Sequence, residues 1–185
     1  VASAWMSMLI YVVMAVFSAA ALVTNNKMCS IFSAAMAPTG ALMAFLALFS
    51  GSFWGRPTWG THWVWDARLT SELILLFLYL GFLALQSAIA DHRRADKACA
   101  VIAIVGVVNV PIIYFSVKWW NTLHQGASIT SKGSSIAPIM LYTLLLMVVA
   151  FWIYSFASTF VRARSMILER ERRQTWVQAL VKEGK

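Results

Sequence analysis

The sequence predicts an all-α integral membrane protein, a polytopic transmembrane helical bundle with five helices in this chain. Hydrophobic residues make up 61% of the 185 positions, whereas charged residues make up 12%. A soluble domain carries about 25% charged residues, so this chain has too little polar surface to face water on all sides. Its apolar residues also fall into long runs, and about 20 such residues span the hydrocarbon core of a bilayer.

Five apolar segments are each long enough to cross a bilayer once, and they form a membrane domain of residues 1–161. The segments run approximately over residues 5–24, 31–53, 71–90, 98–117 and 138–161. Helix is the expected conformation, because lipid offers no water to hydrogen-bond an exposed backbone. Pro38 and Gly40 predict a kink in the second segment. Asn109 and Pro111 predict another kink in the fourth segment.

The connections between these segments alternate in character, and this alternation predicts the orientation. The connections 25–30 and 91–97 and the tail 162–185 carry eleven of the fifteen Lys and Arg residues, whereas the longer connections 55–70 and 118–137 carry four. Lys and Arg collect on the cytoplasmic side of membrane proteins. We therefore expect a cytoplasmic tail of residues 162–185, either solvated or lying on the membrane surface, with loops 55–70 and 118–137 on the outer side.

The net charge of +8 fits this orientation better than nucleic-acid binding, because no basic face coincides with a soluble fold. Cys29 and Cys99 stand apart, without the spacing of a metal site or a haem-attachment motif. Both fall on the cytoplasmic side, where a structural disulfide is not expected. Residue 1 falls on the outer side with no signal peptide ahead of it. We therefore expect at least one upstream helix, which gives six in the intact protein.

Tryptophan gathers in the two outer loops. Six of the nine tryptophans lie in or beside these loops, namely Trp54, Trp59, Trp63, Trp65, Trp119 and Trp120. They could form an aromatic belt, because Trp favours the membrane–water interface. They could also form a platform for a large flat apolar ligand, because indole rings stack and their N–H groups donate hydrogen bonds. Both interpretations stay open, although clustering on one face beside glycine favours the platform.

Three ionisable residues stand at the mouth of the third segment. Arg68 could pair with Asp66 or bind a ligand carboxylate through two parallel hydrogen bonds. Glu72 falls near the start of an apolar helix, where the helix N-terminus favours a carboxylate. For Glu72 we expect capping of this helix rather than ligand binding.

The three histidines differ in their expected surroundings. His124 lies in the outer loop 118–137, beside two of the tryptophans, so a neutral imidazole there is a candidate axial ligand for haem iron. His62 is the other outer histidine. His92 belongs to the charged run Asp91-His92-Arg93-Arg94, where we expect it to be solvated.

Two long motifs carry a resemblance to a known family. The run Trp59-Gly60-Thr61-His62-Trp63-Val64-Trp65-Asp66 resembles the WWD signature of haem-handling proteins, and its continuation Ala67-Arg68-Leu69-Thr70-Ser71-Glu72 is similar to the CcmC branch. Trp119-Trp120-Asn121-Thr122-Leu123-His124-Gln125 resembles the segment that holds a haem-ligating histidine in CcmC proteins. Residues 51–57 and 109–111 also fit. The resemblance covers essentially the whole chain.

The resemblance implies a six-helix protein of the bacterial inner membrane, a mitochondrial one being less expected. Such a protein holds haem b at the periplasmic face between two axial histidines and presents it to the haem chaperone CcmE. CcmD and the ABC-type subunits CcmA and CcmB are the family's other partners. Carried over to this chain, His124 is an axial ligand to the iron, and the platform consists of Trp59, Trp63, Trp65 and Asp66. Trp119, Trp120 and Arg68 are further candidate contacts with haem.

This chain departs from the family's pattern at two points. The family's other axial histidine lies in an outer loop before the first predicted segment, so this ligand would lie upstream of Val1. His62 stands where the family usually has tryptophan. Either the position tolerates another aromatic ring, or His62 adds a polar contact near haem.

Two other functions compete with haem binding. A transporter would move its substrate through the bundle and needs polar groups at mid-membrane, where Asn109 and Gln86 are among the few. A structural membrane subunit would bind no ligand. We do not expect an enzyme, because the resemblance places covalent attachment of haem on the partner.

Overall fold

The computed structural model describes residues 1–120, 129–130, 133–134 and 136–178. Its elements are α1 (Ala2–Thr24), α2 (Lys27–Trp59), α3 (Ala67–Ala88), α4 (His92–Gly106), α5 (Asn109–Trp119), β1 (Ile129–Thr130), β2 (Gly133–Ser134) and α6 (Pro138–Arg170). Strands β1 and β2 form a two-residue antiparallel pair. Within the described ranges, five helices are long and apolar enough to cross a membrane when α4 and α5 are taken as one span. The predicted all-α polytopic fold is therefore confirmed.

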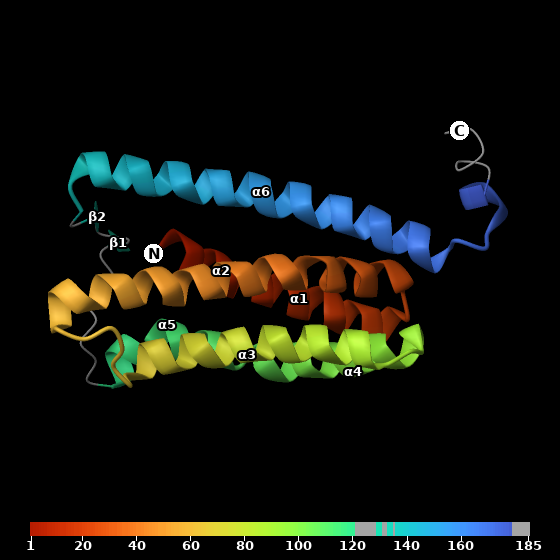
Figure 1. The fold of residues 1–185 in the computed structure, drawn as a ribbon, viewed down its shortest axis with the longest axis horizontal. Coiled ribbons are helices and arrows are strands. Elements are labelled where there is room, and N and C mark those ends of the chain that lie inside the picture. Colours follow the sequence, from red (N-terminus) through yellow and green to blue (C-terminus); the bar gives the residue numbers. More distant parts are fainter. Residues whose placement is uncertain (121–128, 131–132, 135, 179–185) are drawn as a thin grey trace.

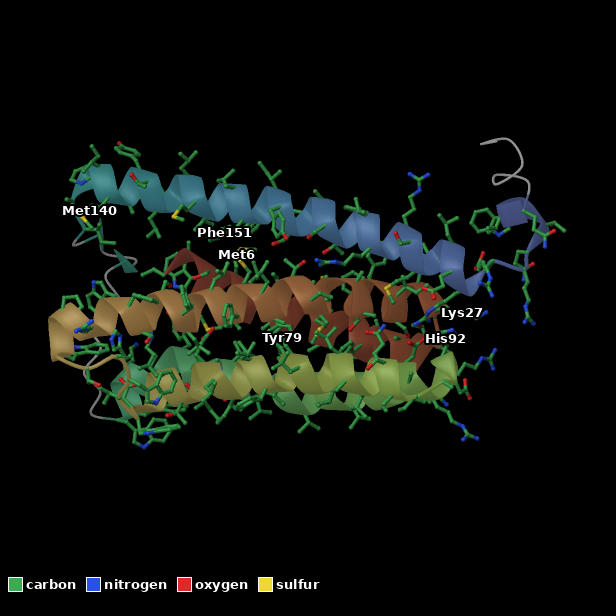
Figure 2. All side chains as sticks on the ribbon, viewed as in Figure 1. Met6, Lys27, Tyr79, His92, Met140 and Phe151 are labelled. Atoms are coloured by element: carbon green, nitrogen blue, oxygen red, sulfur yellow. The ribbon has the colours of Figure 1, made fainter. Side chains whose placement is uncertain are left out.

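The helices lie lengthwise, so the connections sort to two opposite ends of the bundle (Figure 1). One end, which we call the tryptophan end, carries the 60–66 loop, the end of α5 and the start of α6. The opposite end, which we call the basic end, carries the α1–α2 turn, the α3–α4 turn and the end of α6. Lys27 and His92 lie at the basic end, and Met140 lies at the tryptophan end (Figure 2). The two predicted sets of connections thus separate in space.

Several helices extend beyond the apolar segments that predicted them. Helix α2 begins at Lys27, where Asn26 caps it by accepting a hydrogen bond from the Met28 N–H at 2.9 Å. Helix α6 continues to Arg170, into the predicted tail. A helix keeps its backbone bonds in water once its apolar part is anchored, so apolar length alone underestimates it. For the same reason the predicted 55–70 loop shortens to residues 60–66.

The fourth membrane-spanning segment is interrupted between α4 and α5, where the sequence predicts a kink. Pro111 has no N–H to donate to the Val107 carbonyl one turn earlier, and its ring crowds that carbonyl. The Val107 carbonyl instead accepts the N–H of Val110 at 3.0 Å. Pro38, in contrast, lies inside the continuous α2.

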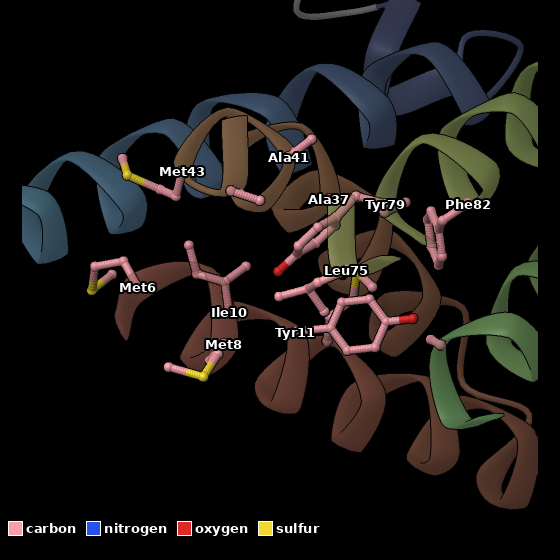
Figure 3. Packing of buried hydrophobic residues seen from close by; sticks show 14 of the residues in the cluster. Met6, Met8, Ile10, Tyr11, Ala37, Ala41, Met43, Leu75, Tyr79 and Phe82 are labelled. Carbon is pink, nitrogen blue, oxygen red and sulfur yellow. The ribbon is translucent and has the colours of Figure 1, made fainter. Parts of the chain in front are cut away.

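A pair of tyrosines occupies the middle of the bundle (Figure 3). The rings of Tyr11 and Tyr79 meet edge to face, with centroids 5.0 Å apart. Both side chains are fully buried. The Tyr79 hydroxyl donates to the Ser7 carbonyl at 2.8 Å, and the Tyr11 hydroxyl donates to the Ile102 carbonyl at 3.1 Å. The pair therefore joins α1 to α3 and to α4 through rings and hydrogen bonds together.

Two glycines make room for this pair. A Cβ atom at Gly40 would lie 2.2 Å from a ring carbon of Tyr79, and a Cβ atom at Gly106 would lie 2.1 Å from the Tyr11 hydroxyl. Small residues allow close helix contact in membranes, where apolar burial gives little drive for association. Gly40 and Gly106 thus let α2 and α4 close onto the tyrosines.

Helix α6 is attached to the bundle mainly through its second half. Its buried residues, Ser155, Thr159 and Ala163, all lie there. Beyond them, Arg170 binds Asp96 of α4 through two hydrogen bonds of 2.8 Å each. The attachment of α6 is therefore concentrated toward the basic end.

Replacing Gly40 with alanine is expected to destabilise the bundle, because the new methyl group overlaps the buried Tyr79 ring. Overpacking of this kind costs about 1–3 kcal/mol, which a thermal unfolding scan of the detergent-solubilised protein would measure. Gly51→Ala is the matched control on the same helix, since nothing lies within 4 Å of a Cβ there. Equal melting temperatures for the two variants would contradict the close-packing account.

Candidate functional site

The 60–66 loop at the tryptophan end is set by two glycines. Gly60 ends α2 in the left-handed conformation, with φ of 76°, and its N–H donates to the Arg56 carbonyl at 3.0 Å. Glycine adopts this conformation without the steric cost of a Cβ atom. The chain then turns back over Gly55, where a Cβ atom would lie 3.1 Å from the Thr61 carbonyl oxygen. The loop therefore lies directly against the last turns of α2.

Thr61 organises the centre of this loop. Its hydroxyl donates to the Trp63 carbonyl at 3.1 Å and accepts the Trp63 N–H at 3.4 Å. The Asp66 N–H donates to the Val64 carbonyl at 2.8 Å. These short-range bonds hold the backbone that carries Trp63 and Trp65. Thr61 was not among the predicted site residues, although local hydroxyl-to-backbone bonds are a known turn signal.

Asp66 caps the N-terminus of α3. Its carboxylate accepts the Leu69 N–H at 2.8 Å, and its carbonyl accepts the Thr70 N–H at 3.0 Å. The expectation that Glu72 caps this helix is wrong, because α3 begins at Ala67 and Glu72 lies in its second turn. Glu72 is instead buried, 5% exposed, and accepts a hydrogen bond from the Ser7 hydroxyl at 2.7 Å.

The predicted tryptophans form local pairs at the tryptophan end. Trp54 and Trp59, near the end of α2, meet edge to face with centroids 5.5 Å apart. Trp63 and Trp65 in the loop meet in the same way, also at 5.5 Å. In the Trp63–Trp65 pair, the edge-to-face contact leaves ring faces that the other indole does not cover.

A second aromatic group lies at the end of α5. Trp119 stacks on Phe115, with ring centroids 5.3 Å apart, and meets Trp120 at 6.0 Å. Both indoles are more than half exposed. The Asn109 amide ties the start of α5 to α3 by donating to the Ser71 carbonyl at 2.8 Å. The 60–66 loop, the start of α3 and the end of α5 lie at the same end of the bundle (Figure 1).

Two hydrogen-bond donors at this end have no described acceptor. The Trp63 indole nitrogen is buried and has no hydrogen-bond partner within the described ranges. Arg68, in the first turn of α3, is half-buried and forms no ion pair or hydrogen bond with any other residue that the structure describes. The ion pair with Asp66 that the sequence allowed is therefore absent, and the guanidinium interacts electrostatically with the buried Glu72 carboxylate.

The predicted histidines differ in their location in the bundle. His62 is exposed in the loop, and its ring lies 6.2 Å from that of Phe53. His92 is the first residue of α4, at the basic end (Figure 2). His124 lies outside the described residues. In the described parts of the chain, no three His, Cys, Asp or Glu side chains gather as they would around a metal ion.

The described residues fit a haem-like ligand in two respects. Indole and phenyl faces can stack on a flat macrocycle. The Trp63 N–H, which has no acceptor among the described residues, and the cationic Arg68 suit the carboxylates that haem carries. An axial ligand to the iron would come from a histidine, since a neutral imidazole binds haem iron.

Asp66→Ala is expected to destabilise α3 by about 1 kcal/mol, because the Leu69 N–H loses its cap. Asp66→Asn should stay close to the parent, since an asparagine oxygen accepts the same hydrogen bond. Thermal unfolding in detergent compares the two variants. If the asparagine variant falls as far as the alanine variant, the negative charge of Asp66 matters rather than its capping bond.

Comparison with known proteins gives one consistent result. The family model described as Heme exporter protein C matches residues 1–178. The chain is 50% identical over 180 residues to Heme exporter protein C of Escherichia coli (strain K12), covering 97% of this chain and 72% of the relative. It is 51% identical over 175 residues to the protein of the same name from Haemophilus influenzae, covering 94% and 71%.

The similarity extends to a plant protein. Over 168 residues, the chain is 45% identical to a putative cytochrome c biosynthesis ccmC-like mitochondrial protein of Marchantia polymorpha, covering 91% of this chain and 71% of that one. A match over nearly the whole chain, to both the family and its individual members, agrees with the two motifs at the tryptophan end. The chain belongs to the CcmC family, that of Heme exporter protein C.

Proposed function

We propose that this protein binds haem b at the periplasmic face of the bacterial inner membrane and hands it to the haem chaperone CcmE. Membership of the CcmC family gives it a role in haem export and cytochrome c maturation. The observation that carries the finer proposal is the gathering, at one end of the bundle, of exposed indoles, of the Trp63 indole N–H, which has no acceptor among the described residues, and of the Arg68 guanidinium. A flat ligand with carboxylates needs these features.

In this proposal the residues at the tryptophan end have different roles. Trp59, Trp63 and Trp65 supply aromatic surface, and Trp119 and Trp120 extend it from α5. Asp66 keeps the loop in place by capping α3. When bound, haem supplies the redox-active iron, and the protein supplies position and orientation.

In this proposal His124 would ligate the haem iron through a neutral imidazole. His62, in the loop, lies beside Phe53 and is not assigned as a ligand in this proposal.

Charge supports the proposed orientation. The basic end carries Lys27, Arg93, Arg94 and Arg170, and Lys and Arg collect on the cytoplasmic side of membrane proteins. The tryptophan end would then face the periplasm. CcmE, with its haem acceptor group, would approach the tryptophan end. CcmD and the ABC-type subunits CcmA and CcmB would assemble with the membrane domain.

The hydrogen bonds of the intramembrane polar groups favour haem binding over transport through the bundle. Glu72 accepts a hydrogen bond from Ser7 of α1, and Asn109 donates one to Ser71 of α3. Polar groups that line a transport path face water or the substrate, whereas these two join neighbouring helices. Because Glu72 and Asn109 join α3 to neighbouring helices, they also hold α3 in position next to the 60–66 loop.

Replacing His124 with alanine should lower haem occupancy or shift the absorption spectrum of the bound haem, because one axial ligand is lost. Added imidazole should partly restore the spectrum. His92→Ala is the matched control, since His92 lies at the basic end. If His62→Ala changes the spectrum and His124→Ala does not, the ligand assignment is wrong.

The orientation can be tested by labelling single cysteines in intact cells. Serine replaces Cys29 and Cys99 in the background, and at position 99 it can keep the bond to the Phe82 carbonyl. A membrane-impermeant maleimide should modify a cysteine placed at Ser131 and spare one placed at Arg94, whose side chain is 85% exposed. The opposite labelling pattern would overturn the orientation, and with it the periplasmic site.

A further inference from the structure

The basic end of the bundle carries more positive charge than its own carboxylates balance. Among the described residues of this end, nine are Lys or Arg and four are Asp or Glu. The cations are Lys27, Arg93, Arg94, Lys97, Arg162, Arg164, Arg170, Arg172 and Arg173, and the carboxylates are Asp91, Asp96, Glu169 and Glu171. This excess of charge takes no part in the proposed haem site, which lies at the opposite end.

Two of these cations hold the fold together. Arg170 binds Asp96, and the two side chains are only 14% and 16% exposed. Arg162 is half-buried and donates to the Thr39 hydroxyl of α2. The other seven Lys and Arg side chains are exposed. Exposed cations of this kind add little to the stability of the fold, so they are available to a partner outside the chain.

The length of α6 places this end at the level of the lipid headgroups. Residues 138–161 of α6 contain no charged side chain. At 1.5 Å per residue these 24 residues span about 36 Å, slightly more than the ~30 Å hydrocarbon core of a bilayer. Arg162 and Arg164 therefore lie at the boundary of that core. Lys27 lies at the same end of the bundle (Figure 2), so a bilayer brings lipid phosphates close to these cations.

The chain beyond α6 turns out of line with that helix (Figure 1). At the turn, the Glu171 N–H donates to the Ile167 carbonyl at 2.9 Å. Residues 175–178 are helical again, and Val177 is only 4% exposed. This segment therefore rests on the protein and leaves the axis of α6 in a defined direction.

Trp176 lies in this segment, close in sequence to the exposed Arg172 and Arg173. It is the one tryptophan of the basic end among the described residues, and its side chain is 43% exposed. Its indole N–H donates to the Glu171 carboxylate at 2.9 Å. Tryptophan concentrates at the membrane–water interface, and Lys and Arg just beyond a transmembrane helix are attracted to anionic headgroups. An exposed indole beside two arginines suits a membrane surface better than bulk water.

We infer that the basic end binds anionic phospholipid headgroups and that residues 171–178 lie on the membrane surface as its anchor. Arg172 and Arg173 supply the charge, and Trp176 supplies the apolar contact. An acidic surface of a partner protein would also match these cations, but it would have to displace the headgroups that the bilayer brings to this depth. The inference does not depend on haem binding.

The depth of this segment can be measured with a single nitroxide spin label. Thr175, whose side chain is exposed, is replaced with a labelled cysteine in a background that carries Cys29→Ser and Cys99→Ser. The protein is reconstituted in vesicles of phosphatidylcholine with or without phosphatidylglycerol, and power-saturation EPR measures access of a neutral nickel chelate to the label. We expect phosphatidylglycerol to lower this access. About 1 M salt should reverse the effect, because it shortens the Debye length to about 3 Å.

Two double variants test which cations are responsible. Arg172→Gln with Arg173→Gln should abolish the effect of phosphatidylglycerol, because each Lys or Arg near an anionic surface strengthens binding about fivefold. Arg56→Gln with Lys118→Gln is the matched control, since it removes two cations at the tryptophan end, one in the last turn of α2 and one in the last turn of α5. It should leave the effect unchanged.

Three outcomes would overturn the inference. Equal access of the nickel chelate in the two kinds of vesicle means that the segment is solvated or reserved for a protein partner. An effect of phosphatidylglycerol that persists in high salt, or in the Arg172→Gln, Arg173→Gln protein, means that these charges do not bind the headgroups. An equal loss of the effect in the matched control means that only the net charge of the protein matters.

Discussion

Tyr11 and Tyr79 meet edge to face in the middle of the bundle, and each hydroxyl donates to a backbone carbonyl of another helix. In lipid, helices gain little from burying apolar surface against one another, so close packing and interhelical hydrogen bonds decide their positions. Gly40 and Gly106 bring α2 and α4 into contact with the same pair. The arrangement of the first four helices thus depends on one pair of rings.

This central contact extends to the tryptophan end through α3. Ser7 accepts from Tyr79 with its carbonyl and donates to Glu72 with its hydroxyl, so one residue of α1 is bonded to α3 at two positions about two helical turns apart. One residue before Glu72, the Ser71 carbonyl accepts the Asn109 amide of α5. Helix α3 is therefore fixed from two sides just below Asp66. A loop built on such a helix presents its side chains in a defined geometry, which recognition of a rigid ligand requires.

The sequence predicts the parts of this structure that depend on composition. The five membrane-spanning segments follow from runs of apolar residues, and the gathering of tryptophan in two loops follows from the positions of one residue type. The interruption in the fourth segment follows from Pro111 and its neighbour Asn109. The helix ends do not, because capping depends on a single side chain. Asp66 stands directly before an apolar run, which is a signal for a helix cap. Glu72 has the same charge and lies close by. Only the observed start of α3 at Ala67 shows that Asp66, and not Glu72, is the cap.

Tertiary contacts are harder to predict from a single sequence than helix ends are. Ser7 and Glu72 are 65 residues apart, and nothing in either segment indicates the other. The buried nitrogen of Trp63 and the exposed ring of Trp65 come from the same residue type two positions apart. Their difference arises from how the loop lies on α2. His124, the most specific expectation from the motifs, lies outside the described residues, so its role stays a prediction.

The close approach at Gly40 also limits how this chain can change over evolutionary time. A side chain at position 40 would occupy the space of the Tyr79 ring, so a larger residue there is compatible only with a smaller one at position 79. The smaller residue would lose the hydroxyl that donates to Ser7. Neither position can therefore drift alone, and sequences that retain this helix arrangement should vary at positions 40 and 79 together or not at all.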